Sequence, residues 1–374
     1  MEPFFTTHVG SLPRPAYLLA AFREFTEGKL AIEEYERILR VAVRSAVEMQ
    51  VQAGIDEVND GEYGRLVYFG DLTGLPGFAQ NMFPLEFSAG DVYRAPLIAG
   101  KIDYVFDKPI AALEVQRVKE VLAELKVKRR IKVTVPSPTH LAYFYPDPKN
   151  PFVPPAFAPY IQRAFDQVKG NYPSLEIFLD EVNAVIVSEV EAAFKAGADS
   201  VQFDSPDLST IPADRVRWAI DQNNMVLQKF PKEKLELHIC WGNYENTQLA
   251  TTGSFRNLQP QLYDLKVGTL GPLEIFDGLR DFKELGVFKE VPPPSDMRLC
   301  AGIVSVKTRN VEPVQALKER YQALVDIVGA DNAVASPGCG FASAGESRII
   351  SLESAKRKLT NLATAVKEVR EVKA

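Results

Sequence analysis

Cysteine and histidine are scarce in this chain of 374 residues, which contains three of each. None of the cysteines stands in a Cys-x-x-Cys pair, so neither a disulfide framework nor a Cys-rich structural zinc site is expected. Free thiols suit a reducing compartment, and we therefore expect a cytoplasmic protein. The positions of these few residues are the first guide to a functional site.

Other absences exclude further classes of protein. No apolar run reaches about eighteen residues, so no membrane span is expected. The first residues lack a basic region followed by an apolar core, so no signal peptide is expected. The net charge of −6 comes without a basic stripe, which argues against a nucleic-acid partner. An apolar content of 46% and a charged content of 25% are those of a soluble globular protein.

What is present is an alternation of short apolar runs and amphipathic stretches. The apolar runs predict strands at Phe4–Val9, Glu57–Gly61, Lys132–Pro136, Ser200–Ser205, Glu236–Cys240, Gly271–Phe276, Leu299–Ser305 and Ala333–Pro337. The amphipathic stretches predict helices at Ile32–Ala53, Ile110–Leu125, Leu175–Ala196, Ala213–Lys229, Pro313–Val328 and Ser351–Val372. The helix expected between Cys240 and Gly271 has the weakest pattern.

This alternation predicts a (β/α)₈ TIM barrel with loop insertions, formed as a single catalytic domain by residues 1–374. A doubly wound open sheet is the alternative, but no Gly-x-Gly-x-x-Gly follows a strand. Residues 70–108 are expected to form a hairpin excursion that includes a strand at Ile102–Phe106. Residues 143–160, rich in proline and aromatic residues, are expected to form a stiff loop; a lid over the barrel mouth and a surface decoration are equally compatible with it.

Scarce reactive residues gather at the expected C-terminal ends of the strands. His238 and Cys240 are two positions apart, so they share one face of a strand, although a core histidine beside a buried thiol gives the same pattern. Cys339 follows the last strand and Glu274 lies in the sixth. Barrel enzymes carry their chemistry at this end. Together the four residues predict a zinc site, in which the carboxylate is the weak, exchangeable ligand.

Five blocks of sequence resemble the cobalamin-independent methionine synthase superfamily, in the same order and along its whole catalytic barrel. The blocks are Thr6-Thr7-His8-Val9-Gly10-Ser11-Leu12-Pro13-Arg14, Asp60-Gly61-Glu62, Gln202-Phe203-Asp204-Ser205-Pro206, His238-Ile239-Cys240 and Pro337-Gly338-Cys339-Gly340. The resemblance implies that His238, Cys240, Glu274 and Cys339 bind Zn²⁺. It also implies that Ser11, Glu62 and Asp204 hold the amino acid part of homocysteine. The two carboxylates suit a substrate ammonium.

The expected activity is that of a zinc-dependent thiol alkyltransferase, with methyl transfer to homocysteine as the leading reaction. Folate is disfavoured as donor, because the chain lacks the family's second barrel and carries Lys307 where the folate enzyme has a histidine. Short relatives include the methionine synthase II-like proteins and epoxyalkane:coenzyme M transferase. Opening of an epoxide by coenzyme M is therefore an alternative, in which Lys307 would stabilise the alkoxide. A non-catalytic barrel with structural zinc is the alternative from another class.

The remaining candidates are assigned from their places near strand ends. Lys307 and His8 are catalytic candidates, and His140 is a candidate for substrate contact or for capping the next helix. Arg14 is a candidate for binding a carboxylate or sulfonate. The partners expected are a small thiol and an alkyl donor, and the sequence is also compatible with a homo-oligomer. Cys300, inside the seventh strand, is expected to be a buried thiol without a role.

Overall fold

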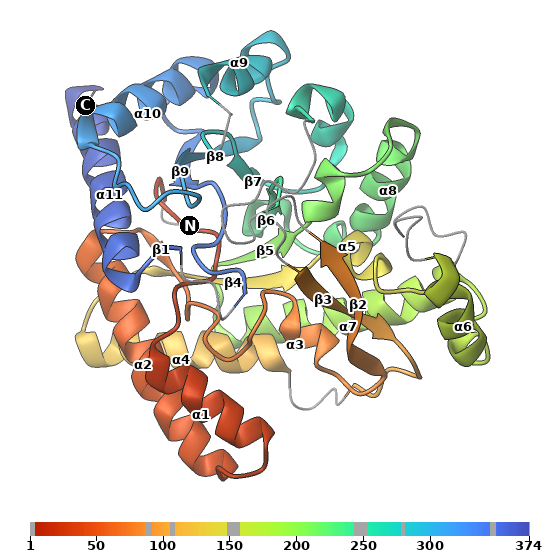
Figure 1. The fold of residues 1–374 in the computed structure, drawn as a ribbon. Helices are drawn as coiled ribbons and strands as arrows, with labels where there is room; N and C mark the ends of the chain where they lie inside the picture. The colour runs from red at the N-terminus through yellow and green to blue at the C-terminus, as the bar shows by residue number, and fades with distance from the viewer. Residues whose placement is uncertain are drawn as a thin grey trace.

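The computed structural model describes residues 4–86, 92–104, 109–147, 158–242, 253–277, 281–344 and 349–373. At its centre lie seven strands in the order β1-β4-β5-β6-β7-β8-β9, each parallel to its neighbours (Figure 1). Their bounds are β1 Glu57–Val58, β4 Arg130–Pro136, β5 Ser200–Asp204, β6 Leu235–Ile239, β7 Thr269–Glu274, β8 Arg298–Val304 and β9 Ala333–Pro337. Because all seven strands run in one direction, their carboxyl ends meet on one face.

The segment around Thr6 closes this sheet into a barrel. Thr7 N donates to Ala335 O of β9 at 3.1 Å, and Glu57 N of β1 donates to Thr6 O at 3.2 Å. The predicted strand Phe4–Val9 is nevertheless only an isolated bridge between Thr6 and Ala335. The reason is that the Asp56 carboxylate accepts the Phe5 and Thr6 N–H groups, at 2.9 and 3.0 Å, and so removes them from a ladder.

Helices surround the strands, as the alternation in the sequence predicts (Figure 1). The bounds of α2 Ile32–Ala53, α4 Ile110–Leu125 and α7 Leu175–Ala196 are those predicted. α8 Val216–Leu227 follows a 3₁₀ turn. α10 Val314–Val328 differs from prediction by one residue at its start, and α11 Leu352–Lys373 by one residue at each end. The prediction of a (β/α)₈ barrel is confirmed. Among the described residues, no helix is long and apolar enough to cross a membrane.

Several elements were not predicted. They are α1 Ala16–Thr26, α3 Gly70–Thr73, α5 Pro138–Ala142, α6 Ala158–Val168 and α9 Phe282–Glu290. Between β6 and β7, the described residues 253–268 contain only 3₁₀ turns, at Phe255–Asn257 and Gln261–Asp264, where a helix was weakly expected. α3 and α5, with four and five residues, are too short for a hydrophobic period to stand out.

The first excursion is a hairpin, as expected, but its strands lie elsewhere. β2 Phe78–Glu86 pairs antiparallel with β3 Val92–Ile98. The expected strand at Ile102–Phe106 is wrong over its described residues 102–104: Ile102 N donates to the Tyr172 hydroxyl at 2.8 Å instead of to another strand. Residues 148–157, the greater part of the expected lid, lie outside the described residues, so the lid stays a prediction.

A polar layer fills the barrel interior near the amino ends of the strands. Lys132 of β4 is fully buried, and its Nζ lies 3.5 Å from Glu236 and 3.9 Å from Glu57. Glu57 also accepts hydrogen bonds from Thr7 at 3.0 Å and from Ser200 at 2.7 Å. Because these residues come from five different strands or strand-like segments, the charges face one another across the barrel and compensate for their own burial.

Candidate metal and thiol site

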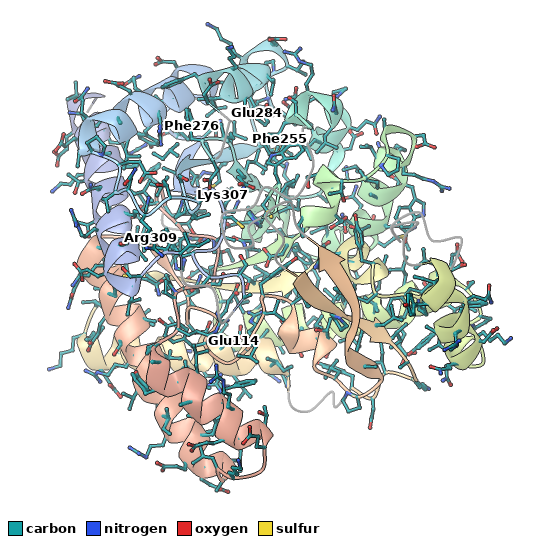
Figure 2. All side chains as sticks on the ribbon, in the orientation of Figure 1. Glu114, Phe255, Phe276, Glu284, Lys307 and Arg309 are labelled. Carbon is teal, nitrogen blue, oxygen red and sulfur yellow. The ribbon has the colours of Figure 1, made fainter. Side chains whose placement is uncertain are left out.

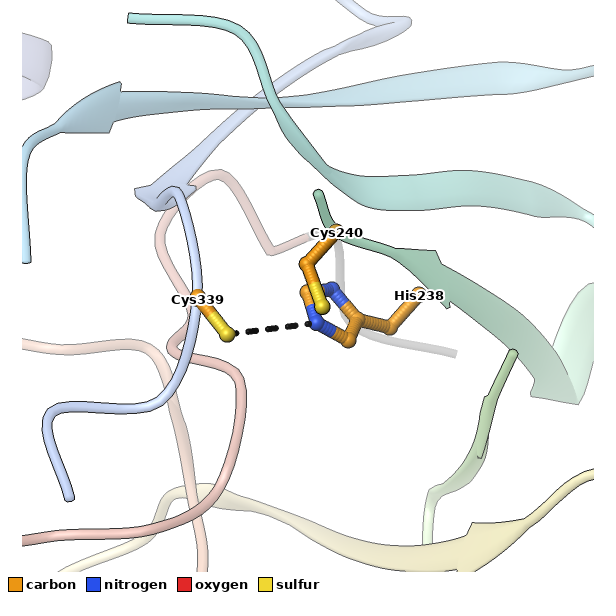
Figure 3. A group of neighbouring side chains, drawn as sticks. All are labelled: His238, Cys240 and Cys339. Carbon is orange, nitrogen blue, oxygen red and sulfur yellow. Dashed lines mark hydrogen bonds between the residues drawn. The ribbon is translucent and has the colours of Figure 1, made fainter. Parts of the chain in front are cut away.

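Three side chains that commonly bind metals meet at the carboxyl face of the barrel. His238 lies near the end of β6, Cys240 follows β6, and Cys339 follows β9 (Figure 3). One ligand atom from each lies within 4.8 Å of the others, and Cys339 Sγ is 3.8 Å from His238 Nε2. All three residues are buried. The structure therefore brings together three of the four ligands predicted for zinc.

The orientation of the His238 ring suits a metal ligand. Nδ1 lies 2.7 Å from Pro272 O, and since a carbonyl only accepts, Nδ1 carries the proton. Nε2, the other ring nitrogen, then offers its lone pair toward the two sulfurs. A hydrogen bond from the outer ring nitrogen to a carbonyl is a common way to fix the tautomer of a ligating histidine.

Cys240 opposes the ionisation of Cys339. The contact with Cys240 comes first, followed by burial, and together they raise the pKa of Cys339 well above its ordinary value, although His238 acts in the opposite direction. A divalent cation between the sulfurs would remove this penalty, because metal binding deprotonates a coordinating thiol. Two sulfurs and one nitrogen are a donor set typical of zinc, with one position left for a further ligand.

Glu274, the fourth predicted ligand, lies beside this group but is engaged elsewhere. Its side chain forms an ion pair with Lys307 Nζ, and its second oxygen accepts a hydrogen bond from Trp241 N. Glu274 is not among the residues whose ligand atoms meet within 4.8 Å. Its role as a zinc ligand thus requires a change of partner and stays a prediction.

Lys307, labelled in Figure 2, forms an ion pair with Glu274 and lies close enough to Asp277 to feel its charge. Burial alone would lower its pKa, but Glu274 and Asp277 outweigh burial and raise the pKa of Lys307. Asp277 in turn accepts hydrogen bonds from Ser305 Oγ and from Val306 N, which anchors the loop that carries Lys307. Lys307 is therefore a charged, fixed cation next to the sulfur site.

Two further carboxylates lie deep in the barrel close to His238. Asp204 ends β5 and pairs in register with His238, and Glu62 lies near enough to act on its charge. Burial first, and the negative charge of Glu62 second, raise the pKa of Asp204 to about 7, although His238 lowers it. Burial also raises the pKa of Glu62, against the opposing charges of Arg65 and Arg14. Such a pair of buried carboxyls is suited to a cationic ligand.

The strand-one motif packs directly on these groups. A Cβ on Gly10 would lie 2.0 Å from Glu62 Oε1, so only glycine allows the approach. Glu62 itself has a φ of 58°, and Thr134 Oγ1 donates to its Oε1 at 2.9 Å. Ser11 O accepts from Phe341 N at 2.9 Å, two residues beyond Cys339. Ser11 thus lies beside the segment that carries Cys339, and Glu62 lies beside Gly10; their role in the amino acid pocket stays a prediction.

Arg14 is used differently from the prediction. Its three guanidinium nitrogens donate to the backbone carbonyls of Glu62, Arg65 and Ala342, at 2.8, 2.9 and 3.0 Å. The side chain is buried. We conclude that it ties together the loops that carry Glu62 and Cys339, so the proposed contact with a substrate carboxylate or sulfonate finds no support in this arrangement.

The other two histidines form hydrogen bonds with residues other than the three of the sulfur site. His8 Nε2 lies 2.8 Å from Gln50 Oε1 of α2, so the ring sits between barrel and helix, because side chains alternate along an extended segment and Thr7 points inward. His140 Nε2 lies 2.9 Å from the Tyr68 hydroxyl within an aromatic cluster. It does not cap α5; Ser137 Oγ does, by accepting from His140 N. The contact with Gln50 gives no support to the catalytic role of His8, which stays a prediction.

Further buried polar residues surround the carboxylates, and sequence reasoning assigned no role to two of them, Gln202 and Lys132. Arg65 pairs with Asp71 and with Glu114, both at 2.9 Å. Gln202 donates to Asp204 at 2.7 Å, and Lys132 donates to Gln202 at 2.8 Å. Gln202 lies two positions before Asp204 on β5, so strand alternation was the available signal that the two side chains share a face.

A comparison with known protein families identifies the family of this chain. The model of the catalytic domain of cobalamin-independent synthases matches residues 4–133 and 169–367. The chain belongs to this family. His238, Cys240 and Cys339 all lie within the matched residues of this cobalamin-independent synthase domain.

Relatives of similar length match this chain over nearly its full length. It is 25% identical over 370 residues to a protein named methionine synthase from Saccharolobus solfataricus, covering 98% of this chain and 95% of the relative. It is 27% identical over 375 residues to the methionine synthase of Sulfolobus acidocaldarius, with coverage of 98% and 92%. A solved B12-independent methionine synthase from Shewanella, in complex with selenomethionine, has a TM-score of 0.75 at 20% identity, with 99% of each chain covered, and supports the fold.

Proposed function

We propose that this synthase-family chain is a zinc-dependent transferase that moves a methyl group to the thiol of homocysteine and so forms methionine. The observation that carries the proposal is the convergence of His238, Cys240 and Cys339 on one point at the barrel mouth. The relatives named methionine synthase supply the substrate class, because they share nearly the full length of the chain.

The residues present fit zinc. His238, Cys240 and Cys339 would hold the ion, and the fourth position would be open to the substrate sulfur. Zinc bound there would keep that sulfur as a thiolate at neutral pH, where a free thiol with a pKa of about 8.5 is mostly protonated. The protein's contribution is to fix the ligand geometry and to exclude water, since all three residues are buried.

The carboxylates beside the sulfur site suit the amino acid part of homocysteine. Glu62 and Asp204 would receive the substrate ammonium, which relieves two buried carboxyls whose pKa values are raised in the free protein. Ser11 borders the same space. A non-catalytic barrel with structural zinc gives no reason for carboxylates beside the metal ligands.

One observation favours the second candidate, the opening of an epoxide by coenzyme M. Lys307 is a buried cation beside Glu274 at the sulfur site, and a fixed cation stabilises a developing alkoxide. Coenzyme M carries a sulfonate and no ammonium, so it would offer no cation to Glu62 and Asp204. Homocysteine is therefore the better match to the site as a whole. The methyl donor is left open, with folate disfavoured.

The first experiment measures zinc in the purified protein and in Cys240→Ser and Cys339→Ser. Cys300→Ala is the matched control, because Cys300 is a buried cysteine in β8 that packs with Phe4 and Val334, away from the site. We expect one zinc per chain in the wild type and in Cys300→Ala, and loss of zinc in the two serine variants. Unchanged zinc in both serine variants would refute the metal site.

The second experiment identifies the thiol. Zinc X-ray absorption is recorded with and without homocysteine, and calorimetric titrations compare homocysteine with coenzyme M. The proposal expects one more sulfur around zinc with homocysteine and tighter binding of homocysteine. Tight binding of coenzyme M alone, unaffected by Asp204→Asn, would favour the epoxide reaction. An unchanged zinc shell with both thiols would favour a structural metal.

A further inference from the structure

The side chain of Gln202 connects the polar layer inside the barrel to the substrate-facing carboxylate. Gln202 is completely buried in β5. Its Oε1 accepts a hydrogen bond from Lys132 Nζ at 2.8 Å. Its Nε2 donates to Asp204 Oδ1 at 2.7 Å and to Val9 O at 2.8 Å. The amide thus has three partners, which come from three different parts of the barrel wall.

These partners allow only one orientation of the amide. An ammonium group can only donate, so the end of Gln202 that faces Lys132 must be the oxygen. A backbone carbonyl can only accept, so the end that faces Val9 must be the NH₂ group. A flip of the amide would place its oxygen against Val9 O and the Asp204 carboxylate, and its NH₂ against a cation. The orientation is therefore a consequence of the contacts.

Lys132 is itself fixed by the polar layer. Its Nζ donates to Thr7 Oγ1 at 2.8 Å, as well as to Gln202, and it lies 3.5 Å from Glu236. No water-exposed alternative exists for this ammonium, since the side chain is fully buried. Its charge polarises the amide of Gln202 and so strengthens the hydrogen bond that Nε2 donates to Asp204.

The result at Asp204 is an asymmetric carboxylate. Oδ1 receives the N–H of Gln202, while Oδ2 receives no hydrogen bond from the described part of the chain. Oδ1 is thus held by the hydrogen bond from Gln202, and Oδ2 is left for a ligand. We propose that Gln202, oriented by Lys132, is a positioning residue that aims the free oxygen of Asp204 at the ammonium group of the amino acid substrate.

This inference rests on the proposed function, because it assumes that Asp204 receives a substrate ammonium. It adds the prediction that discrimination for the amino group depends on residues that never touch the substrate. Removal of Gln202 should leave the thiol end of binding intact, because His238, Cys240 and Cys339 are not its partners. The loss should appear only with a thiol that carries an amine.

The test compares two thiols that differ by that one group. Zinc-loaded full-length protein is titrated in a calorimeter with homocysteine and with 4-mercaptobutanoic acid, which lacks the amine. The variants are Gln202→Met, which keeps the length of the side chain without its amide, and Gln202→Asn, which keeps the amide but is one methylene too short to reach Asp204. If Gln202→Met fails to fold, Gln202→Asn decides the question.

Ser200→Ala is the matched control. Ser200 lies on the same strand and in the same polar layer, and it donates to Glu57 without touching Gln202. Zinc content and thermal unfolding are measured for every variant, so that a general loss of the fold is distinguished from the specific effect. Ser200→Ala is expected to bind both thiols as the wild type does.

The inference expects the affinity for homocysteine to fall roughly tenfold or more in the Gln202 variants, the size of one lost charge-assisted hydrogen bond, with the affinity for 4-mercaptobutanoic acid changed much less. Equal weakening of both thiols overturns it, as does a preference for homocysteine that survives the substitution. If the wild type itself binds the two thiols equally, the proposed function fails and this inference fails with it.

Discussion

Lys307 and Glu274 form a buried ion pair at the edge of the sulfur site, with side chains that are 5% and 0% exposed. The pair joins Lys307, a catalytic candidate, to Glu274, the fourth predicted zinc ligand. In the metal-free protein, each carries the charge that makes the burial of the other tolerable. Their relationship leads to the first prediction.

Lys307→Met is expected to destabilise the metal-free protein by about 3–5 kcal/mol, because it leaves Glu274 as an unpaired buried charge. The measurement is chemical unfolding in the presence of a chelator. Lys307→Met combined with Glu274→Met should recover most of the loss. Saturating zinc should stabilise Lys307→Met more than it stabilises the wild type if the freed Glu274 carboxylate becomes a ligand. An equal zinc effect in both proteins would count against Glu274 as a ligand.

Gly10→Ala is expected to displace the Glu62 carboxylate, since the added Cβ would lie 2.0 Å from its Oε1. A shift of about 1 Å in a positioning group weakens recognition by up to roughly a hundredfold, so the Kd for homocysteine should rise at least tenfold. Gly286→Ala in α9 is the control, because its Cβ would meet nothing within 4 Å. Unchanged homocysteine binding in Gly10→Ala would remove Glu62 from the binding site.

Arg14→Met is expected to lower the free energy of unfolding by at least about 3 kcal/mol, because three buried backbone carbonyls lose their donor. The ratio of the affinities for homocysteine and coenzyme M should stay unchanged, since the guanidinium holds loops rather than ligands. Calorimetry checks the ratio, and denaturant unfolding checks the stability. A selective loss of coenzyme M binding would restore the sulfonate role.

The buried His140 leads to a prediction about the stability of the protein at acidic pH. Burial lowers the pKa of His140 to about 3. Between that pH and the unfolded value of about 6.5, the unfolded chain binds a proton that the native chain does not bind. His140 therefore makes the free energy of unfolding rise as the pH increases across this window, and fall as the pH decreases through it.

His140→Phe isolates the effect, because buried carboxyls with raised pKa values change stability in the opposite direction. The stability difference between the variant and the wild type should change by about 1.4 kcal/mol per pH unit between pH 4 and pH 6. Tyr68→Phe removes the hydrogen-bond partner of His140 without removing a proton site. Its stability difference should be the same at both pH values. A pH-independent difference for His140→Phe would show that His140 titrates normally.

Local pattern in the sequence was enough for most strands and helices of the barrel and for three residues that meet at its carboxyl face. A helix of the barrel must bury its apolar face against the sheet, so its position can be predicted from a local hydrophobic period, as at Ile32–Ala53. The scarcity of cysteine and histidine made His238, Cys240 and Cys339 conspicuous. Parallel strands then required their carboxyl ends to share one face. The family resemblance, confirmed by the match over most of the chain, rests on the same residues.

The tertiary structure decided the direction in which each polar side chain points and the partner it meets. His8 lies next to Gly10-Ser11 in sequence, yet one step of alternation turns it toward Gln50 of α2. Arg14 donates hydrogen bonds to backbone carbonyls of loops that lie up to 328 positions away in the sequence. The orientation of Gln202 requires Lys132 and Val9 from separate segments of the barrel wall. Hydrogen-bond partners across a barrel depend on register and on three-dimensional closure, and neither leaves a period in the sequence.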